Sequence, residues 1–581
     1  MLKIYVYYLS FLLMNIYPAS IHAKSINIHV LGLSGALKKN VEEHLSIIKI
    51  QEVTINNRFY NRVQKIVKEA TKVFGYYEPK IQMHLNQTKQ NRKEPVLIIQ
   101  VIPGEPVIIA GIRVKLHGDA QKDRDYLNLI AYQLPKLGST LNHGEYEKFK
   151  KSLNNLALEK GYFNANYYRN QLKVSVQKHQ AFWDIGYNSG KRYHFSRITF
   201  TGSQLLKQYL QNLVPFKEGT YYTSRHMADL SRRLSDTGWF HSVILIPTLD
   251  ESNQGAFLRL HGILTERTEN TFTTGIGSSR KIGMHIRTMW DKNIINNRGH
   301  SFKTIANISS PECELRFSYK IPILENPLEK YYLLQGSLKR IHWNDIKTDS
   351  SIITTSRYWN SSNGWKKAIN LHWRLERFTQ DGITNTAMLM YPGISVDRTS
   401  SYGGLMPTHG YSQHYSIDFS DISWGSCIDF LVFKIENSWI KTIKKRNRLI
   451  IHTDFGWIQT HHFEKIPPDM RFFAGGNHSI RGYKYKGLSP RDHNGKILGA
   501  SKIVIGSLEH QYNINGKWWT AVFIDIGEVV QEFKQKNIKI SAGFGIRWNS
   551  PLGPIKLDIA RPVNDRNHHR IQSYIGLGPE L

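Results

Sequence analysis

The feature that most constrains this sequence is a unit that occurs three times in its N-terminal half. Each copy opens with an apolar alternation that ends at a glycine: Ile28–Gly32, Val114–Gly118 and Ile198–Gly202. Each copy later carries a glycine followed by two aromatic residues: Gly75-Tyr76-Tyr77, Gly161-Tyr162-Phe163 and Gly238-Trp239-Phe240. Landmarks that recur in the same order every ~85 residues predict three copies of one small domain.

The pattern inside each copy predicts a strand, two helices and two further strands. Phe149, Leu153 and Leu156 follow one another at spacings of four and three, as on one face of a helix. The later glycine is expected to cap a helix, and the aromatic pair after it to begin a strand. We place the strand that closes each unit at 96–101, 171–176 and 256–264. The predicted α+β domains therefore cover 24–104, 105–187 and 188–266, and none contains a nucleotide loop, a zinc quartet or a serine elbow.

After residue 266 the hydrophobic pattern changes to a period of two. Ile369, Leu371, Trp373 and Leu375 alternate with polar residues, and 543–548 and 555–560 alternate in the same way. An apolar face opposite a face of charges and glycines is typical of a transmembrane β-barrel, whose closure leaves no unpaired edge in the hydrocarbon. Over 267–581, sixteen strands would each have about 20 residues with their connection, and twenty-two would have about 14. We predict a 16-stranded antiparallel barrel.

The N-terminus and the composition indicate where such a chain acts. Lys3, an apolar run over 4–16 and the small residue Ala23 predict a secretory signal peptide over 1–23. The run is too short to span a membrane as a helix. The net charge of +31 fits either a phosphate-rich partner or a composition rich in Lys, Asn and Ile, and we favour composition. Two cysteines, Cys313 and Cys427, exclude a disulfide-dense scaffold, and we expect no bridge between them.

A glycine-rich stretch holds the densest motif of the C-terminal half. Arg471-Phe-Phe-Ala-Gly475-Gly476 is followed by Ser479-Ile480-Arg481-Gly482-Tyr483. The glycines permit a tight re-entrant loop, and Arg481 presents a planar fork of five donors. Glu509 and Asp525 are the candidate acceptors for this fork.

The alternation around Asp525 places its carboxylate inside the barrel. Asp525 shares a strand face with Phe523 and Gly527, while Val522, Ile524 and Ile526 form the opposite, lipid-facing side. An arginine–carboxylate pair there would fix the loop against the barrel wall. The pair would contribute ~0–1 kcal/mol if exposed, and breaking it in a desolvated site would cost ~3–5 kcal/mol. The alternative is that these residues serve only the folding of the barrel.

These motifs resemble a known family. Ser479–Tyr483, Gly506–Glu509 and Phe523–Gly527 are similar to the signature motifs of the outer-membrane assembly superfamily that includes BamA. The threefold unit resembles the polypeptide-transport-associated (POTRA) domains of that superfamily. Three such domains, a barrel of this length and the terminus Tyr574–Leu581 are similar to the TamA-type subunits of the translocation and assembly module. BamA has five POTRA domains, and two-partner secretion transporters have two.

The resemblance implies an outer-membrane protein that is not an enzyme. Its barrel would promote the folding of outer-membrane proteins and the secretion of autotransporters through a seam between its first and last strands. The POTRA domains would lie in the periplasm and dock a TamB-like partner anchored in the inner membrane. No cofactor, metal or nucleic acid is implied. The implied lock between loop and barrel consists of Arg481, Gly482, Tyr483, Glu509, Asp525 and Gly527, with Gly475 and Gly476 as loop glycines.

Other functions remain open from the sequence alone. A BamA-like or two-partner-secretion-type transporter carries the same elements, and a passive pore would use a positive lumen for anionic solutes. A periplasmic enzyme has little support, because His461-His462 and His568-His569 lack a His-x-x-x-His spacing. Trp518-Trp519 is interpreted as part of an aromatic girdle at the membrane interface.

Overall fold

The computed structural model describes most of the chain: residues 27–48, 56–86, 96–250, 256–279, 283–343, 346–361, 363–380, 382–477, 479–492, 495–533, 538–551, 553–565 and 570–578. The predicted signal peptide, His568-His569 and the last three residues lie outside the described residues. No helix within these ranges has the length and apolar character needed to cross a membrane.

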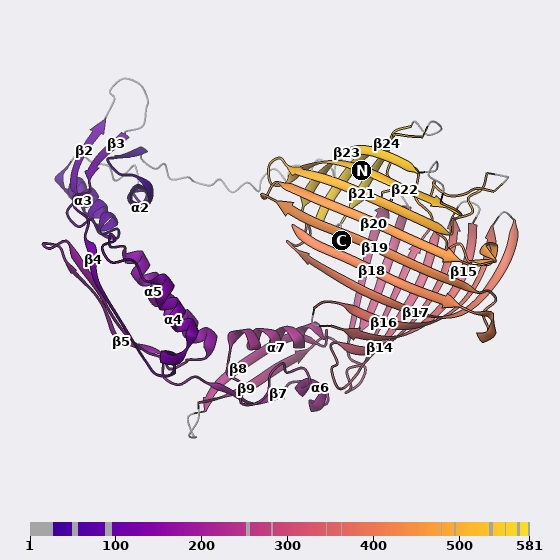
Figure 1. Cartoon of the computed structure of the whole chain (residues 1–581), viewed down its shortest axis with the longest axis horizontal. Coiled ribbons are helices and arrows are strands. Elements are labelled where there is room, and N and C mark those ends of the chain that lie inside the picture. Colours follow the sequence, from indigo (N-terminus) through magenta and orange to yellow (C-terminus); the bar gives the residue numbers. More distant parts are fainter. Residues whose placement is uncertain are drawn as a thin grey trace, which may run out of the picture. The chain divides into compact units, whose positions relative to one another are not determined.

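Three α/β units come first, each with a three-stranded sheet (Figure 1). The first contains β1 (Asn27–Leu31), α2 (Gly35–Leu45), α3 (Asn57–Lys72), β2 (Lys80–Asn86) and β3 (Val96–Ile102). The second contains β4 (Ile108–His117), the 3-10 helix η2 (Asp119–Lys122), α4 (Arg124–Gln133), α5 (His143–Lys160), β5 (Asn166–Ser175) and β6 (Gln180–Asn188). The third contains β7 (His194–Thr201), α6 (Lys207–Gln211), α7 (Ser224–Asp236), β8 (Phe240–Asp250) and β9 (Phe257–Glu266).

The three sheets share one topology, which explains the recurring glycines. Their strand orders are β1-β3-β2, β4-β6-β5 and β7-β9-β8, so that the last strand of each unit lies in the centre. Gly32 and Gly202 follow the opening strands with φ of +83° and +81°. A Cβ atom there would lie 2.3 Å from the carbonyl oxygen of Val101 and 2.1 Å from that of Leu264, respectively, so any side chain would clash.

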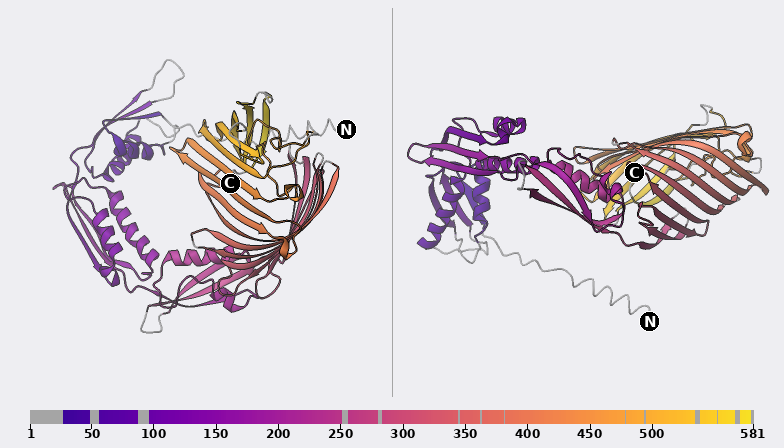
Figure 2. Two further views of the ribbon diagram at one scale, coloured as in Figure 1. Left: turned by 45° about the vertical axis from the view of Figure 1, so that its right-hand side comes forward. Right: turned by 90° about the horizontal axis from the view of Figure 1, so that it is seen from below.

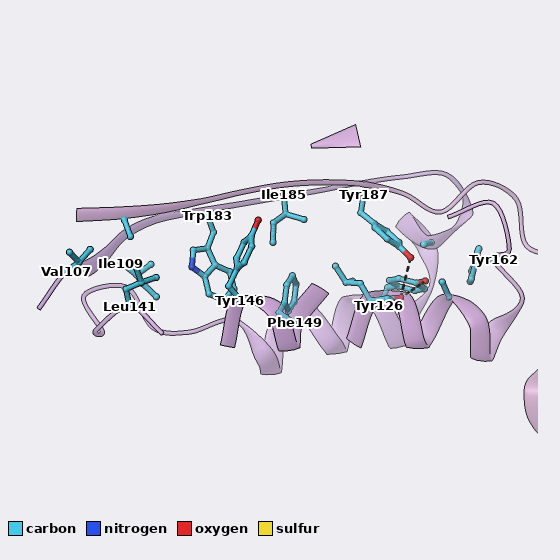
Figure 3. Packing of buried hydrophobic residues seen from close by; sticks show 14 residues of the cluster. Val107, Ile109, Tyr126, Leu141, Tyr146, Phe149, Tyr162, Trp183, Ile185 and Tyr187 are labelled. Carbon is cyan, nitrogen blue, oxygen red and sulfur yellow. Dashed lines mark hydrogen bonds between the residues drawn. The ribbon is translucent and has the colours of Figure 1, made fainter. Parts of the chain in front are cut away.

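The second unit shows how each sheet covers its helices (Figure 3). Trp183, Ile185 and Tyr187 project from β6 toward the helices, and Tyr146 and Phe149 project from α5 to meet them. All five side chains are buried. Helix α5 ends at Gly161, which adopts the left-handed conformation with φ of +85° and donates its N–H to the carbonyl of Ala157. The predicted helix through Phe149, Leu153 and Leu156 and its glycine cap are thus present.

Two details of the predicted units are wrong. The strand that closes the second unit is β6 at Gln180–Asn188, whereas the predicted 171–176 lies at the end of β5, its antiparallel partner. The aromatic pair Tyr162-Phe163 does not begin a strand, because β5 starts only at Asn166. The ring of Phe163 instead packs against two tyrosines of the next unit: Tyr193, just before β7, at 5.6 Å, and Tyr222, just before α7, at 4.9 Å.

The glycine of the aromatic motif forms a joint to the following unit. Val107 N donates to Gly75 O (2.9 Å), and Tyr193 N donates to Gly161 O (3.1 Å). Val107 and Tyr193 each precede the first strand of the next unit by one residue. The same backbone hydrogen bond therefore connects the first unit to the second and the second to the third.

The rest of the chain forms one continuous antiparallel sheet of 16 strands, β10 to β25, in sequence order. Its strands are β10 (Asn270–Ser279), β11 (Gly283–Lys292), β12 (Ser301–Ser309), β13 (Glu312–Pro322), β14 (Lys330–Trp343), β15 (Ile346–Asn360), β16 (Lys366–Gln380), β17 (Ile383–Tyr402), β18 (His409–Ser420), β19 (Phe430–Ile443), β20 (Asn447–Gln459), β21 (Lys502–Asn513), β22 (Trp518–Val530), β23 (Lys539–Ser550), β24 (Gly553–Pro562) and β25 (Gln572–Leu577). Figure 2 shows this curved sheet from two further sides. The three α/β units and the 16 strands confirm the predicted fold class.

The sheet is open between its first and last strands. In the part of the chain that the structure describes, β10 pairs only with β11, and β25 pairs only with β24. The outer face is apolar, because Val522, Ile524 and Ile526 on β22 are 57%, 47% and 44% exposed. On the opposite face of the same strand, Asp525 is fully buried.

Candidate functional site

The candidate site is the long loop over 460–501, which connects β20 to β21. Arg471 fixes the base of this loop, because its guanidinium donates hydrogen bonds to three backbone carbonyls and to one side-chain amide oxygen. The acceptors are Ile466 O (2.8 Å), Glu464 O (2.8 Å), Leu498 O (2.8 Å) and Gln380 Oε1 (2.9 Å). Because three acceptors belong to the loop itself, Arg471 holds both of its ends together.

Arg481 connects the middle of the loop to the inner face of the sheet. Its Nε and Nη2 donate to the two carboxylate oxygens of Asp525 at 2.9 and 2.8 Å, and its backbone N–H donates to the same carboxylate at 2.9 Å. Its Nη1 donates to Glu509 Oε2 at 2.5 Å. The guanidinium also lies 3.4 Å from the ring centre of Phe523. Arg481 is only 6% exposed, and this fully hydrogen-bonded arrangement satisfies a charge that would be costly to leave unpaired.

A second arginine, which the sequence analysis missed, completes the cluster. Arg547 on β23 donates to Glu509 Oε1 at 2.8 Å and to Asp558 Oδ1 at 2.5 Å. Glu509 thus accepts from both arginines, and Asp558 Oδ2 lies 3.6 Å from Arg481 Nη1. Arg547 and Asp558 both alternate with apolar residues in the sequence, which places them on the polar face of β23 and β24. This alternation was the sequence signal that could have identified them. We call the two arginines and the three carboxylates the lumen cluster.

The residues after Arg481 reach the last strand. Gly482 N donates to the hydroxyl of Tyr574 on β25 at 2.8 Å, and that hydroxyl donates to Tyr483 O at 2.7 Å. The hydroxyl of Tyr483 donates to Asp565 Oδ2 at 3.3 Å, in the connection between β24 and β25. One end of the open sheet is therefore held by the same loop segment that enters the lumen cluster.

The predicted glycines lie where side chains would not fit. Gly482 has φ of +96°, and a Cβ atom would lie 3.1 Å from the backbone of Arg561 and Pro562. At Gly527 a Cβ atom would lie 2.6 Å from Val504 O. Gly475 and Gly476 have φ of +104° and +105°, so both sit in the left-handed region within the loop.

His461 and His462 are exposed, and no group of three metal-binding side chains occurs among the described residues.

Comparison with protein families identifies the sheet. The Omp85 superfamily domain matches residues 298–578, and the first TamA-type POTRA domain matches residues 27–103. A third family, the surface antigen variable number repeat of POTRA type, matches residues 193–260. The sheet therefore resembles the Omp85 superfamily domain, and the first and third α/β units resemble POTRA domains. Because the second α/β unit shares the sheet topology of the other two, all three are called POTRA domains from here on.

Individual relatives agree with this assignment. The outer membrane protein assembly factor BamA of Nitratidesulfovibrio vulgaris is 31% identical over 107 residues, which cover 17% of this chain and 14% of that protein. The chloroplastic outer envelope protein 80 of Arabidopsis thaliana is 28% identical over 124 residues, 19% of this chain and 15% of that protein. The matched parts are thus a small fraction of these relatives' lengths.

The fold is that of a solved barrel. The crystal structure of BamA from Haemophilus ducreyi lacking POTRA domains 1–3 superposes with a TM-score of 0.66 at 14% sequence identity. The match covers 81% of this chain and 98% of that chain. The family matches place the 16 strands in the outer membrane of a Gram-negative cell and the POTRA domains in the periplasm.

Proposed function

We propose that this chain is a TamA-type subunit of a translocation and assembly module. It promotes the insertion and folding of outer-membrane proteins and the secretion of autotransporters. Its sheet opens sideways between β10 and β25, and its POTRA domains dock a TamB-like partner anchored in the inner membrane.

The open edges of the sheet carry this proposal. β10 and β25 each pair on one side only among the described residues, so each presents backbone N–H and C=O groups without a strand partner. Such an edge is a template for an incoming strand. β25 has only six residues against ten in β10, so closing the sheet through these two strands would form few hydrogen bonds. A client strand can therefore compete with closure.

The loop over 460–501 supports a role for the lumen cluster at the seam. Tyr574 of β25 bridges the backbones of Gly482 and Tyr483, directly after the arginine that contacts Asp525 and Glu509. We propose that Arg481, Gly482, Tyr483, Glu509, Asp525 and Gly527 form a lock that sets the position of the last strand, with Gly475 and Gly476 shaping the loop.

The POTRA domains support the choice of partner. The first matches the TamA type, and the chain has three such units before the sheet. The docking of a TamB-like protein and the handling of unfolded clients are inferred from this likeness.

Secretion of an autotransporter tests the proposal. The chain and its own TamB-like partner would be expressed together in a strain that lacks the endogenous module. Rescue of surface display that requires both proteins is the expected result. Rescue of general outer-membrane protein assembly in a strain depleted of BamA would instead favour a BamA-like function. Large open-pore conductance in a planar bilayer without any rescue would favour a passive pore.

A further inference from the structure

One end of the sheet faces the periplasm, and its turns can be assigned. β10 begins four residues after β9 ends the third POTRA domain, so the N-terminal end of β10 is periplasmic. Because the strands are antiparallel and in sequence order, the turns that follow β11, β13, β15, β17, β19, β21 and β23 lie at the same end.

The third POTRA domain occupies the first of these turns. Its segments 198–216 and 227–247 belong to the same compact unit as the sheet. They contact the β11–β12 and β13–β14 turns through four hydrogen bonds: Leu206 N to Asn297 O (2.9 Å), Asn212 Nδ2 to Leu324 O (2.6 Å), Trp239 Nε1 to Gly299 O (3.0 Å) and Arg233 Nη1 to Glu329 Oε1 (3.3 Å). The β13–β14 turn carries carboxylates that pair with cations: Lys330 Nζ lies 2.6 Å from Glu325 Oε2, and Arg233 Nη1 lies 3.3 Å from Glu329 Oε1.

The β19–β20 and β21–β22 turns, nearer the last strand, differ from the β13–β14 turn, because the charges on them are all positive. Five exposed cations lie on the β19–β20 and β21–β22 turns or at the end of β19: Lys441 near the end of β19, Lys444, Lys445 and Arg446 on the first turn, and Lys517 on the second. Asn513 N donates to Arg446 O at 2.8 Å and holds the two turns together. No aspartate or glutamate occurs over 437–453 or 510–524. None of the five cations forms an ion pair with a carboxylate in the described ranges. We call these five residues the basic rim.

Apolar side chains of the lipid-facing surface adjoin the basic rim. Ile443 and Ile514 are 48% and 55% exposed at the strand ends that flank the cations. Trp518 and Trp548 are stacked on neighbouring strands, with ring centres 5.9 Å apart, and both remain exposed. Exposed tryptophans at strand ends are typical of the membrane–water interface. The basic rim therefore lies at the depth of the lipid headgroups.

The backbone of the β19–β20 turn favours other residues than lysine. Lys444 and Lys445 have φ of +49° and +60°. Asn and Gly adopt this left-handed conformation with the least strain and are the usual residues in such hairpins. The backbone geometry therefore does not explain why lysine occupies these two positions. We infer that their positive charge has a function.

We propose that the basic rim binds the phosphate headgroups of anionic phospholipids in the periplasmic leaflet. The ammonium and guanidinium groups face a headgroup from the turns, while Trp518 and the neighbouring isoleucines contact the upper acyl chains. Basic groups at a membrane surface attract anionic lipid within a Debye length, so the effect weakens with salt. The inference rests on the location of the sheet in the membrane and not on the proposed assembly function.

Lipid enrichment measures this binding. The full chain is reconstituted in bilayers of phosphatidylcholine with phosphatidylglycerol as the minor component and extracted in mild detergent. Mass spectrometry then gives the ratio of the two lipids that remain bound. We expect phosphatidylglycerol to be enriched over the bulk ratio, and Lys444→Gln with Lys445→Gln to lower that enrichment by up to roughly fivefold for each lysine. An unchanged ratio in this variant would overturn the proposal.

Two further variants separate charge from folding. Lys366→Gln with Lys367→Gln removes an equal charge from the first two residues of β16, at the same end of the sheet, and should leave most of the enrichment. An equal loss of enrichment in this control would mean unspecific attraction and would overturn the proposed site. Lys444→Asn with Lys445→Gly suits the left-handed backbone, so it should fold at least as well, as judged by heat-modifiable gel migration, and still lose enrichment. If the native chain shows no enrichment at all, the lipid assignment is wrong and the basic rim fits an acidic protein instead.

Discussion

The Nε and Nη2 atoms of Arg481 lie 2.9 and 2.8 Å from the two carboxylate oxygens of Asp525. This bidentate pair joins a residue of the loop to the middle of strand β22, where Asp525 has no exposed surface. A planar fork is required for such a geometry, which lysine cannot reproduce.

Reversal of the charge at Arg481 should release the loop. In Arg481→Glu, a fourth carboxylate would face Glu509, Asp525 and Asp558, and breaking the buried pair should cost about 3–5 kcal/mol. We expect new protease cleavage within 460–501 and lost secretion, at a normal level of protein in the membrane. Arg491→Glu is the control, since Arg491 is exposed in the same loop and donates to a backbone carbonyl. Disappearance of the Arg481 variant from the membrane would mean that the pair serves folding alone.

The Tyr574 hydroxyl should hold the last strand in place. Tyr574→Phe leaves Gly482 N and Tyr483 O without this partner, and each buried orphan costs about 1–3 kcal/mol. Hydrogen exchange over 572–577 should therefore become faster. Tyr512→Phe, which changes a tyrosine that is 43% exposed on β21, should leave the exchange of these residues as it was. If residues 572–577 exchange at the same rate in both variants, the loop does not hold β25 in place.

The joint between the second and third POTRA domains should depend on Gly161. An alanine there would adopt φ of +85° and place its Cβ 2.8 Å from Tyr222 Cβ. Gly138 has φ of +82°, and a Cβ atom there would have no neighbour within 4 Å. Gly138→Ala therefore measures only the cost of the left-handed backbone for alanine, about 1–2 kcal/mol. In pulse proteolysis of the full chain, Gly161→Ala should lower the free energy of unfolding by more than Gly138→Ala. Equal losses would mean that the joint adapts to the extra methyl group.

Acid should weaken the second POTRA domain through Asp123. Burial acts to raise the pKa of this carboxyl, but Lys160, the N–H of Asp125 and the hydroxyl of Tyr162 outweigh burial and hold the pKa below its usual range. A depressed pKa gives stability that is present above the unfolded value of 3.8 and lost as the pH falls through the folded pKa. In thermal unfolding of the full chain, Asp123→Asn should unfold at a lower temperature than the native chain at neutral pH. Below about pH 4 the two unfolding temperatures should approach each other. A difference that does not change with pH would contradict this.

The sequence predicted what local patterns encode. The helix through Phe149, Leu153 and Leu156, its glycine cap and the alternation around Asp525 follow from spacing and are present in the structure. The closing strand of the second POTRA domain was misplaced, although Trp183, Ile185 and Tyr187 alternate in it. The error arose because β5 and β6 are both strand-like and only the sheet order shows which one is central.

Partners that meet across several strands could not be read from spacing. Arg547 and Glu509 are brought together from β23 and β21, which are separated by β22. Likewise, Tyr574 meets Gly482 only because the loop packs against the inner face of the sheet, and no local pattern marks that contact.

The most direct test of the account is the site at which a client contacts the sheet. A photo-crosslinking amino acid at Ile276 on the edge strand β10 is compared with one at Ile369 on β16, because both isoleucines face outward, 74% and 54% exposed. If clients insert at the open edge, autotransporter secretion should give client adducts at Ile276 and few or none at Ile369. Equal labelling at both positions, or secretion without any adduct at Ile276, would contradict insertion at the open edge.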